Sequence, residues 1–145
     1  MILPDLNLLM YAYNPHSPLH NQARKWWQDV ANSDRLIGLP HDTLFSFIRI
    51  STNPALENAA VSLTEARNVV NSWLQLPNTR ILLPGPDHFA RVLHLMEKTN
   101  SVGRILSDAT LAAYAIENRA TLCSNDSDFA RFKDLDWVNP LDKSG

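Results

Sequence analysis

The chain has 145 residues, with 45% hydrophobic and 19% charged side chains and a formal net charge of −2; these values indicate one globular domain without a basic electrostatic footprint. Only four glycines are present, which argues against a P-loop or a glycine-rich dinucleotide fold. The single cysteine, Cys123, excludes an internal disulfide and a zinc site built from cysteines.

The first half of the chain alternates short apolar segments with longer amphipathic ones, which predicts strands separated by helices. In chain order, the expected elements are a strand over residues 1–3, a helix over 6–13, a helix ending near 31, a strand over 36–39, a helix over 42–51 and a helix that contains Leu74. Ser17-Pro18 is typical of a cap and a first helical turn, and Ser62 or Thr64 is expected to cap the last of these helices.

The second half continues the same alternation. The expected elements are a strand over 80–83, helices over 87–99 and 104–118, a strand over 121–123 and a short strand over 136–138. Short apolar strands that alternate with helices are typical of an α/β fold with a mainly parallel sheet. We therefore expect a single domain over residues 1–141, followed by a frayed tail over 142–145.

No membrane segment is predicted. The apolar residues at the N-terminus are interrupted by Asp5 and Asn7, unlike those of a signal peptide. No later stretch approaches the roughly 18 apolar residues that a spanning helix needs. We expect a cytoplasmic protein without membrane contact.

Acidic residues follow the predicted strands or begin predicted helices. Asp5 comes directly after the first strand, Asp42 begins the helix after the second strand, and Asp126 lies three residues after the strand at 121–123, with Asp128 beside it. In open α/β sheets, ligands bind beyond the carboxyl ends of the strands. These acids are therefore expected to face one crevice.

Asp108 belongs to the predicted helix over 104–118. Leu111, Ala112 and Ala115 share its face, so Asp108 should lie on the packed side of this helix. A charged group there must be paired, hydrogen-bonded or bound to a metal, because burying it alone is costly. Asp108 is thus the acid least easily explained as a solvated side chain.

Together these residues predict a cluster of carboxylates. Like charges repel and raise each other's pKa unless a cation neutralises them. Oxygen ligands select a hard cation such as Mg²⁺ or Mn²⁺, which can activate water and stabilise phosphoryl transition states. The chemistry predicted is hydrolysis of a phosphodiester. On the helix that begins at Asp42, Ser46 and Arg49 share the face of that acid.

Structural roles for these acids remain open at this point. Asp5 and Asp42 could cap helices, and Asp128 could cap the turn over 129–131. Two other functions also remain: a phosphomonoesterase with Asp5 as nucleophile, and a non-catalytic domain that binds a partner protein.

Four stretches match a known family in order along nearly the whole chain: LPDLNLLMYA, LPHDTLFSFIRISTNP, LSDATLAAYAIENRATLCSNDSDFARF and LDWVNP. In these stretches the chain resembles PIN-domain proteins, and more closely the VapC toxins of bacterial toxin–antitoxin pairs. The subgroup that it resembles carries an Arg-x-x-Thr-Asn-Pro-like segment. The resemblance implies a PIN fold, a mainly parallel sheet of four or five strands between two layers of helices.

The resemblance also implies an activity and partners. These are endoribonuclease cleavage dependent on Mg²⁺ or Mn²⁺, often of tRNA or rRNA, a VapB-type antitoxin and a homodimer. It places the metal-binding acids at Asp5, Asp108 and Asp126, and a further acid at Asp128. Asn7 matches a polar position near the first acid, and Ser124 a hydroxyl position before Asp126.

The chain departs from the family pattern at one site. Ser46 stands where the family has a glutamate in the helix after the second strand. Asp42 lies one turn earlier on the same face and could supply the missing carboxylate. The expected catalytic set is therefore Asp5, Asp42, Asp108 and Asp126, and Arg49 is expected to orient its helix or contact phosphate.

Overall fold

The computed structural model describes residues 1–100 and 102–141. Five short strands form its centre: β1 (Ile2–Pro4), β2 (Ile37–Pro40), β3 (Thr79–Leu82), β4 (Thr121–Cys123) and β5 (Trp137–Val138). They lie in the order β3-β2-β1-β4-β5, and every neighbouring pair is parallel. The parallel α/β fold predicted from the sequence is confirmed; the tail at 142–145 falls outside the described residues.

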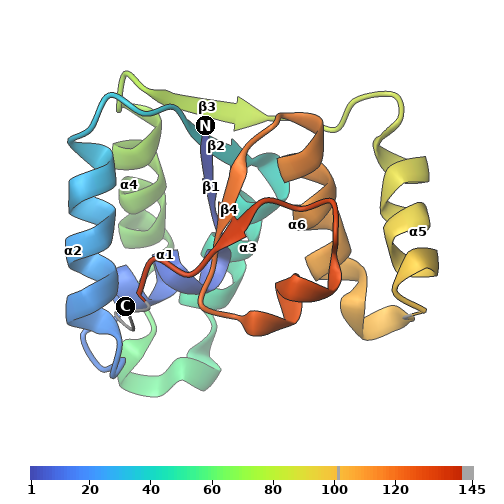
Figure 1. Cartoon of the computed structure of the whole chain (residues 1–145). Helices are drawn as coiled ribbons and strands as arrows, with labels where there is room; N and C mark the ends of the chain where they lie inside the picture. The colour runs from blue at the N-terminus through green and yellow to red at the C-terminus, as the bar shows by residue number, and fades with distance from the viewer. Residues whose placement is uncertain (101, 142–145) are drawn as a thin grey trace.

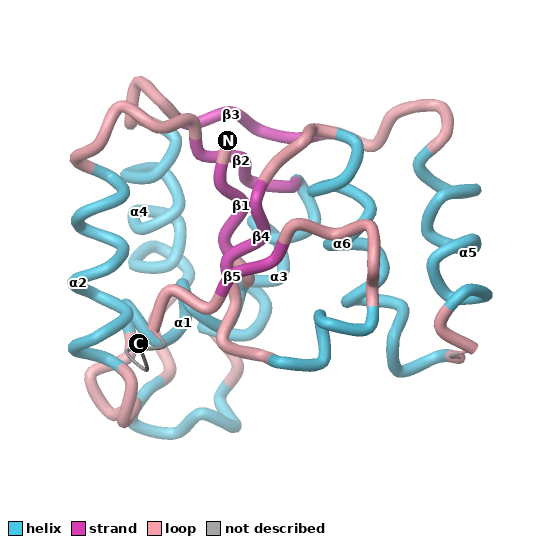
Figure 2. Tube along the Cα trace, in the orientation of Figure 1, coloured by secondary structure: helices cyan, strands magenta, loops and turns pink. Residues whose placement is uncertain are grey.

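The sheet is covered by helices on both faces (Figures 1 and 2). The α-helices are α1 (Leu6–Tyr13), α2 (His20–Ala31), α3 (His41–Ser51), α4 (Leu63–Leu74), α5 (His88–Lys98) and α6 (Leu106–Glu117). Three short 3₁₀ helices, which the sequence did not predict as such, are η1 (Pro54–Ala59), η2 (Gly103–Ile105) and η3 (Ser127–Arg131). No helix of the described ranges is long and apolar enough to cross a membrane.

Two hydrophobic cores fill the space between the three layers. Strand residues alternate between the faces of the sheet, so Ile2 packs with α1 to α4 and Leu3 packs with α5 and α6. On the second face, α6 presents buried alanines to the sheet, including Ala112 and Ala115. Small residues let this helix lie close to the strands, which brings its first turn to the carboxyl ends of β1 and β4.

The helix starts were predicted with mixed success. Ser62 caps α4 as expected, since its Oγ accepts a hydrogen bond of 3.1 Å from the backbone N–H of Glu65. The predicted cap at Ser17 is wrong, because α2 begins only at His20. Ser17 instead closes the preceding turn, where its Oγ accepts from the N–H of Leu19 at 3.2 Å. The Ser17 hydroxyl therefore accepts a hydrogen bond within the turn that contains Pro18, and it accepts none from the first turn of α2.

Candidate active site

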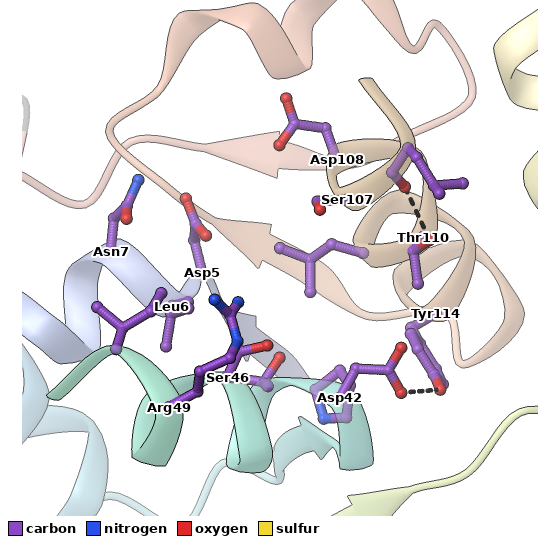
Figure 3. Close-up of a pocket in the computed structure, with 15 residues that line it drawn as sticks. Asp5, Leu6, Asn7, Asp42, Ser46, Arg49, Ser107, Asp108, Thr110 and Tyr114 are labelled. Atoms are coloured by element: carbon purple, nitrogen blue, oxygen red, sulfur yellow. Dashed lines mark hydrogen bonds between the residues drawn. The ribbon is translucent and has the colours of Figure 1, made fainter. Parts of the chain in front are cut away.

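A pocket of about 470 Å³ opens at the carboxyl ends of β1 and β2. Its walls come from the chain after β1, from α3 and from the first turns of α6 (Figure 3). The lining residues are Asp5, Leu6, Asn7, Pro40, Asp42, Thr43, Ser46, Arg49, Ile50, Leu106, Ser107, Asp108, Thr110, Leu111 and Tyr114. The pocket therefore lies at the carboxyl ends of the strands, where the sequence predicted the site.

Asp5 is held at the base of this pocket by the sheet. Pro4 and Cys123 are paired in the register of β1 and β4, and the N–H of Asp5 donates to the carbonyl of Cys123 at 2.8 Å. Asp5 occupies the N-cap position of α1, but its side chain makes no capping hydrogen bond. The side chain is instead hydrogen-bonded to Ser124, so Asp5 occupies the cap position of α1 while its carboxylate is held at the pocket.

Ser124 links the first acid to the fourth. It is fully buried, its hydroxyl donates to Asp5 Oδ2 at 2.7 Å, and its Oγ accepts from the N–H of Asp126 at 3.0 Å. The indole of Trp137 donates to the Ser124 carbonyl at 3.0 Å, which ties this loop to β5. Burial raises the pKa of Asp5 above its usual value, and the Ser124 hydrogen bond partly opposes that rise.

The two acids near η3 have different environments. Asp126 is the N-cap of η3, and its Oδ1 accepts from the N–H of Asp128 at 2.9 Å. The alternative in which Asp128 caps this turn is therefore wrong. The side chain of Asp128 is 62% exposed and lies 3.4 Å from the guanidinium of Arg131. Of these two acids, Asp126 is the one hydrogen-bonded to the buried Ser124.

Asp108 faces these acids from the first turn of α6, half-buried as its place on the helix predicted. Burial raises the pKa of Asp108 to about 6. The negative charges of Asp126, Asp5 and Asp128 push it in the same direction, while Arg131 opposes them. Carboxylates from three separate segments thus lie within electrostatic reach of one another.

The α3 side of the pocket carries Asp42, Ser46 and Arg49 on one helical face, as their spacing predicted. The residue at the N-cap of α3 is Pro40, so the capping interpretation of Asp42 is wrong. Figure 3 shows Asp42 directed toward Tyr114 and the Arg49 side chain extending toward Asp5. Arg49 forms no ion pair within the part of the chain that the structure describes.

Tyr114 is a site residue that the sequence reasoning missed. Its hydroxyl donates to Asp42 Oδ1 at 3.0 Å, although 72 residues separate the two. Burial, followed by the hydrogen bond to Asp42, raises the pKa of the Tyr114 phenol. A tyrosine within the alanine-rich α6 was the only signal in the sequence, and it does not identify the partner.

The donor set fits a hard divalent cation in its chemistry. Asp5, Asp108 and Asp126 offer only oxygen, which Mg²⁺ and Mn²⁺ prefer. Their mutual repulsion is the situation that a bound cation relieves. Over residues 1–100 and 102–141, no three His, Cys, Asp or Glu side chains lie close enough to hold an ion together in this conformation. Small side-chain movements or bridging waters would have to complete the coordination shell.

Comparison with known proteins defines the family. Residues 2–135 match the model of the PIN domain, and the chain belongs to the PIN-domain family. It is 43% identical over 141 residues to Ribonuclease VapC33 of Mycobacterium tuberculosis, an alignment that covers 97% of this chain and 99% of that protein. It is 37% identical over 142 residues to Ribonuclease VapC43 of the same organism, covering 98% and 97%. These near-complete alignments place it with the VapC-type members.

Solved structures support the fold. The structure of VapBC2 from Rickettsia felis bound to a DNA fragment from its promoter has a TM-score of 0.70 at 18% identity and covers 96% of this chain and 98% of that one. VapC20 of Mycobacterium tuberculosis, described as a Sarcin-Ricin loop cleaving toxin, has a TM-score of 0.68 at 15% identity and covers 90% and 93%. The predicted PIN fold is therefore confirmed.

Proposed function

We propose that the chain is the toxin of a VapBC-type pair and an endoribonuclease that depends on Mg²⁺ or Mn²⁺. The observation that carries this proposal is Asp108, a half-buried carboxylate whose pKa is raised by burial and, in addition, by acids from two other segments. Such a cluster is unfavourable without a cation. The names of the relatives, which are ribonucleases, support the same reaction class.

In this proposal Asp5, Asp108 and Asp126 would hold the ion, and Asp128 would complete the shell directly or through water. The ion, when bound, would activate water and neutralise charge on the phosphate under attack. Ser46 stands where the family has a glutamate, and Asp42, one turn earlier on the same helix, would supply the missing carboxylate. Asp42 lines the same pocket but is anchored toward Tyr114, so its contribution is smaller or passes through water.

The remaining polar residues of the site position the acids and the substrate. Ser124 fixes the orientation of the Asp5 carboxylate through its hydroxyl. Asn7 lines the pocket next to Asp5 and can donate to an RNA oxygen. Arg49 is free to contact phosphate, since none of the ion pairs among the described residues includes it.

The decisive experiment is inducible expression of the wild type beside Asp5→Asn and Asp108→Asn, with sequencing of cellular RNA 5′ ends. The wild type alone should arrest growth and create new RNA ends. Asp29→Asn, an acid on the exposed side of α2, is the matched control and should behave as the wild type. Equal growth and identical RNA ends for all four proteins would contradict the nuclease.

The same proteins separate the two other functions that the sequence leaves open. Turnover of a small phosphomonoester without RNA cleavage would favour a phosphomonoesterase with Asp5 as nucleophile. Toxicity that survives Asp108→Ala, without Mg²⁺-dependent cleavage of any RNA, would favour a non-catalytic partner-binding domain.

We further propose that the protein works in the cytoplasm on tRNA or rRNA, is inhibited by a VapB-type antitoxin, and forms a homodimer. A relative in fold, VapBC2, supports the antitoxin, since it was solved as a complex bound to promoter DNA. Co-expression with a small protein encoded beside it should restore growth. Size-exclusion chromatography of the purified chain should show a dimer; a monomer at all concentrations would contradict that part.

A further inference from the structure

A second pocket, of about 120 Å³, lies where the last turn of α5 meets the chain at the end of η3. We call it the α5–η3 pocket. Its rim carries three cations, Lys98, Arg131 and Lys133, and one acid, Asp134. Its apolar floor is formed by the buried Leu95 and Phe132. In a chain with a net charge of −2, three cations around one hollow form a local positive site.

The cations of this pocket are only partly neutralised. Lys98 Nζ lies 3.3 Å from Asp134 Oδ2, both on exposed side chains. Arg131 pairs with Asp128, and its Nε donates to the Asp128 carbonyl at 2.9 Å, which fixes the direction of the side chain. Lys133 is exposed and forms no ion pair within the described residues. The pocket therefore retains the capacity to bind an anion.

The α5–η3 pocket is joined through η3 to Asp126, one of the acids of the cluster. Asp126 caps one end of η3, and Arg131 is the last residue at the other end. At about 2 Å per residue, a five-residue 3₁₀ helix separates them by roughly 10 Å. Figure 1 shows η3 and the end of α5 at the same lower edge of the molecule.

The position of these cations would offset the repulsion between RNA and the acidic pocket. RNA is a polyanion, and the pocket that would cut it presents Asp5, Asp42 and Asp108. Among the lining residues in the described part of the chain, Arg49 is the only lysine or arginine. Phosphate contacts outside the reacting centre fix the register and orientation of a nucleic acid strand. Cations at the α5–η3 pocket can supply such a contact at a short distance from the acids.

We propose that the α5–η3 pocket binds a backbone phosphate of the RNA strand and so positions the strand across the acid pocket. The proposal rests on the proposed ribonuclease function. Lys98 and Lys133 contact the phosphate from two sides. Arg131, held in place by its contacts with Asp128, forms the part of the site next to η3. Asp134 competes with the phosphate for Lys98, so it weakens the binding of RNA.

The test measures binding separately from cleavage. Wild type, Lys98→Gln and Lys133→Gln are titrated in EDTA with a short fluorescein-labelled single-stranded RNA over a range of KCl concentrations. Each lost phosphate contact should reduce the slope of log K against log[salt] by about 0.7. Asp134→Asn should bind more tightly than wild type, and Lys133→Arg should keep the wild-type slope. Lys25→Gln, a lysine exposed on α2, is the control for net charge.

The outcomes separate this proposal from the nuclease itself. With Mg²⁺ present, Lys98→Gln and Lys133→Gln should raise KM for RNA several-fold and leave kcat nearly unchanged. Wild-type salt slopes and KM values in both variants would overturn the phosphate site, even if the protein cuts RNA. Variants that lose binding only to an acidic peptide, and not to RNA, would overturn it as well. A wild type that binds RNA with the expected slope but cuts none would instead contradict the proposed nuclease.

Discussion

The two walls of the acid pocket are built in different ways. The β1–β4 wall is Asp5, which lines the pocket, together with Ser124 and Asp126, which support it from outside the lining. Hydrogen bonds of 2.7 and 3.0 Å join these three residues around the fully buried serine. The α3 wall, made of Asp42, Ser46 and Arg49, is more exposed, and its acid is anchored by one hydrogen bond to Tyr114. Rigid placement is thus concentrated on the wall that carries two of the three proposed metal ligands.

The difference follows from how each wall is connected to the sheet. β1 and β4 are neighbours in register, with Pro4 opposite Cys123, so the residues that follow them must meet. The α3 wall is positioned by helical spacing along one surface and by the single hydrogen bond from Tyr114 to Asp42. A site that needs fixed geometry therefore gains more from strand ends than from a helix face.

The largest expected effect distinguishes the walls by activity. Asp5→Asn or Asp108→Asn should lower RNA cleavage about 1,000-fold or more, because each removes a charge that a bound cation needs. Asp42→Asn on the α3 wall should cost about tenfold, since that carboxylate is directed toward Tyr114. The measurement is the initial rate of cleavage of a labelled RNA in Mg²⁺, with Asp29→Asn as control. Equal losses at Asp42 and Asp5 would break the comparison.

The next effect tests the rigidity of the β1–β4 wall. Ser124→Ala removes a buried hydroxyl that serves both Asp5 and the N–H of Asp126. Leaving such groups without a partner should lower the free energy of unfolding by about 1–3 kcal/mol, measured by urea denaturation. Ser72→Ala is the matched control, because that exposed hydroxyl only donates to the carbonyl of Val69. A Ser124→Ala protein as stable as the control would show that the wall is not held by this serine.

A smaller effect concerns pH and the charge of the cluster. The pKa of Asp108 is raised from 3.8 to about 6, so in the metal-free protein the folded state binds more protons than the unfolded state between these values. Stability should therefore fall as pH rises from about 4 to 6, and remain lower above that range.

Asp108→Asn removes this pH effect. In EDTA at neutral pH, the variant should melt a few degrees above the wild type, and its Tm should depend less on pH over that window. Mg²⁺ should then stabilise the wild type and not the variant. Parallel pH profiles for the two proteins would mean that burial and the neighbouring acids do not raise the pKa of Asp108 in the fold.

Much of the fold was accessible from the sequence, because its signals are local. Short apolar runs that precede Asp5 and Ser124, and the spacing of Asp42, Ser46 and Arg49, identify strand ends and one helix face. The location of the site at the carboxyl ends of the strands followed from the general rule for ligand binding in open α/β sheets. None of these inferences required knowledge of which elements touch.

The parts that failed depend on contacts or on turn geometry. The pairing of Tyr114 with Asp42 arises only when α6 packs near α3, and no periodicity encodes it. Asp126 and Asp128 both suit the cap of η3 by residue type. The extended backbone at Asp126, with φ of −90° and ψ of 109°, decides between them. The backbone conformation, which residue type alone did not specify, made Asp126 the cap.

The smallest predicted effect asks whether the anchor of the α3 wall matters. Tyr114→Phe keeps the buried ring and removes only the hydroxyl that donates to Asp42. Because Asp42 is exposed and can turn to water, the loss of stability should be about 1 kcal/mol or less. Cleavage should fall by less than the tenfold expected for Asp42→Asn, and a double variant should be no worse than Asp42→Asn alone. If the two losses multiply instead, Tyr114 acts on the substrate directly, and the α3 wall is a second working surface of the pocket.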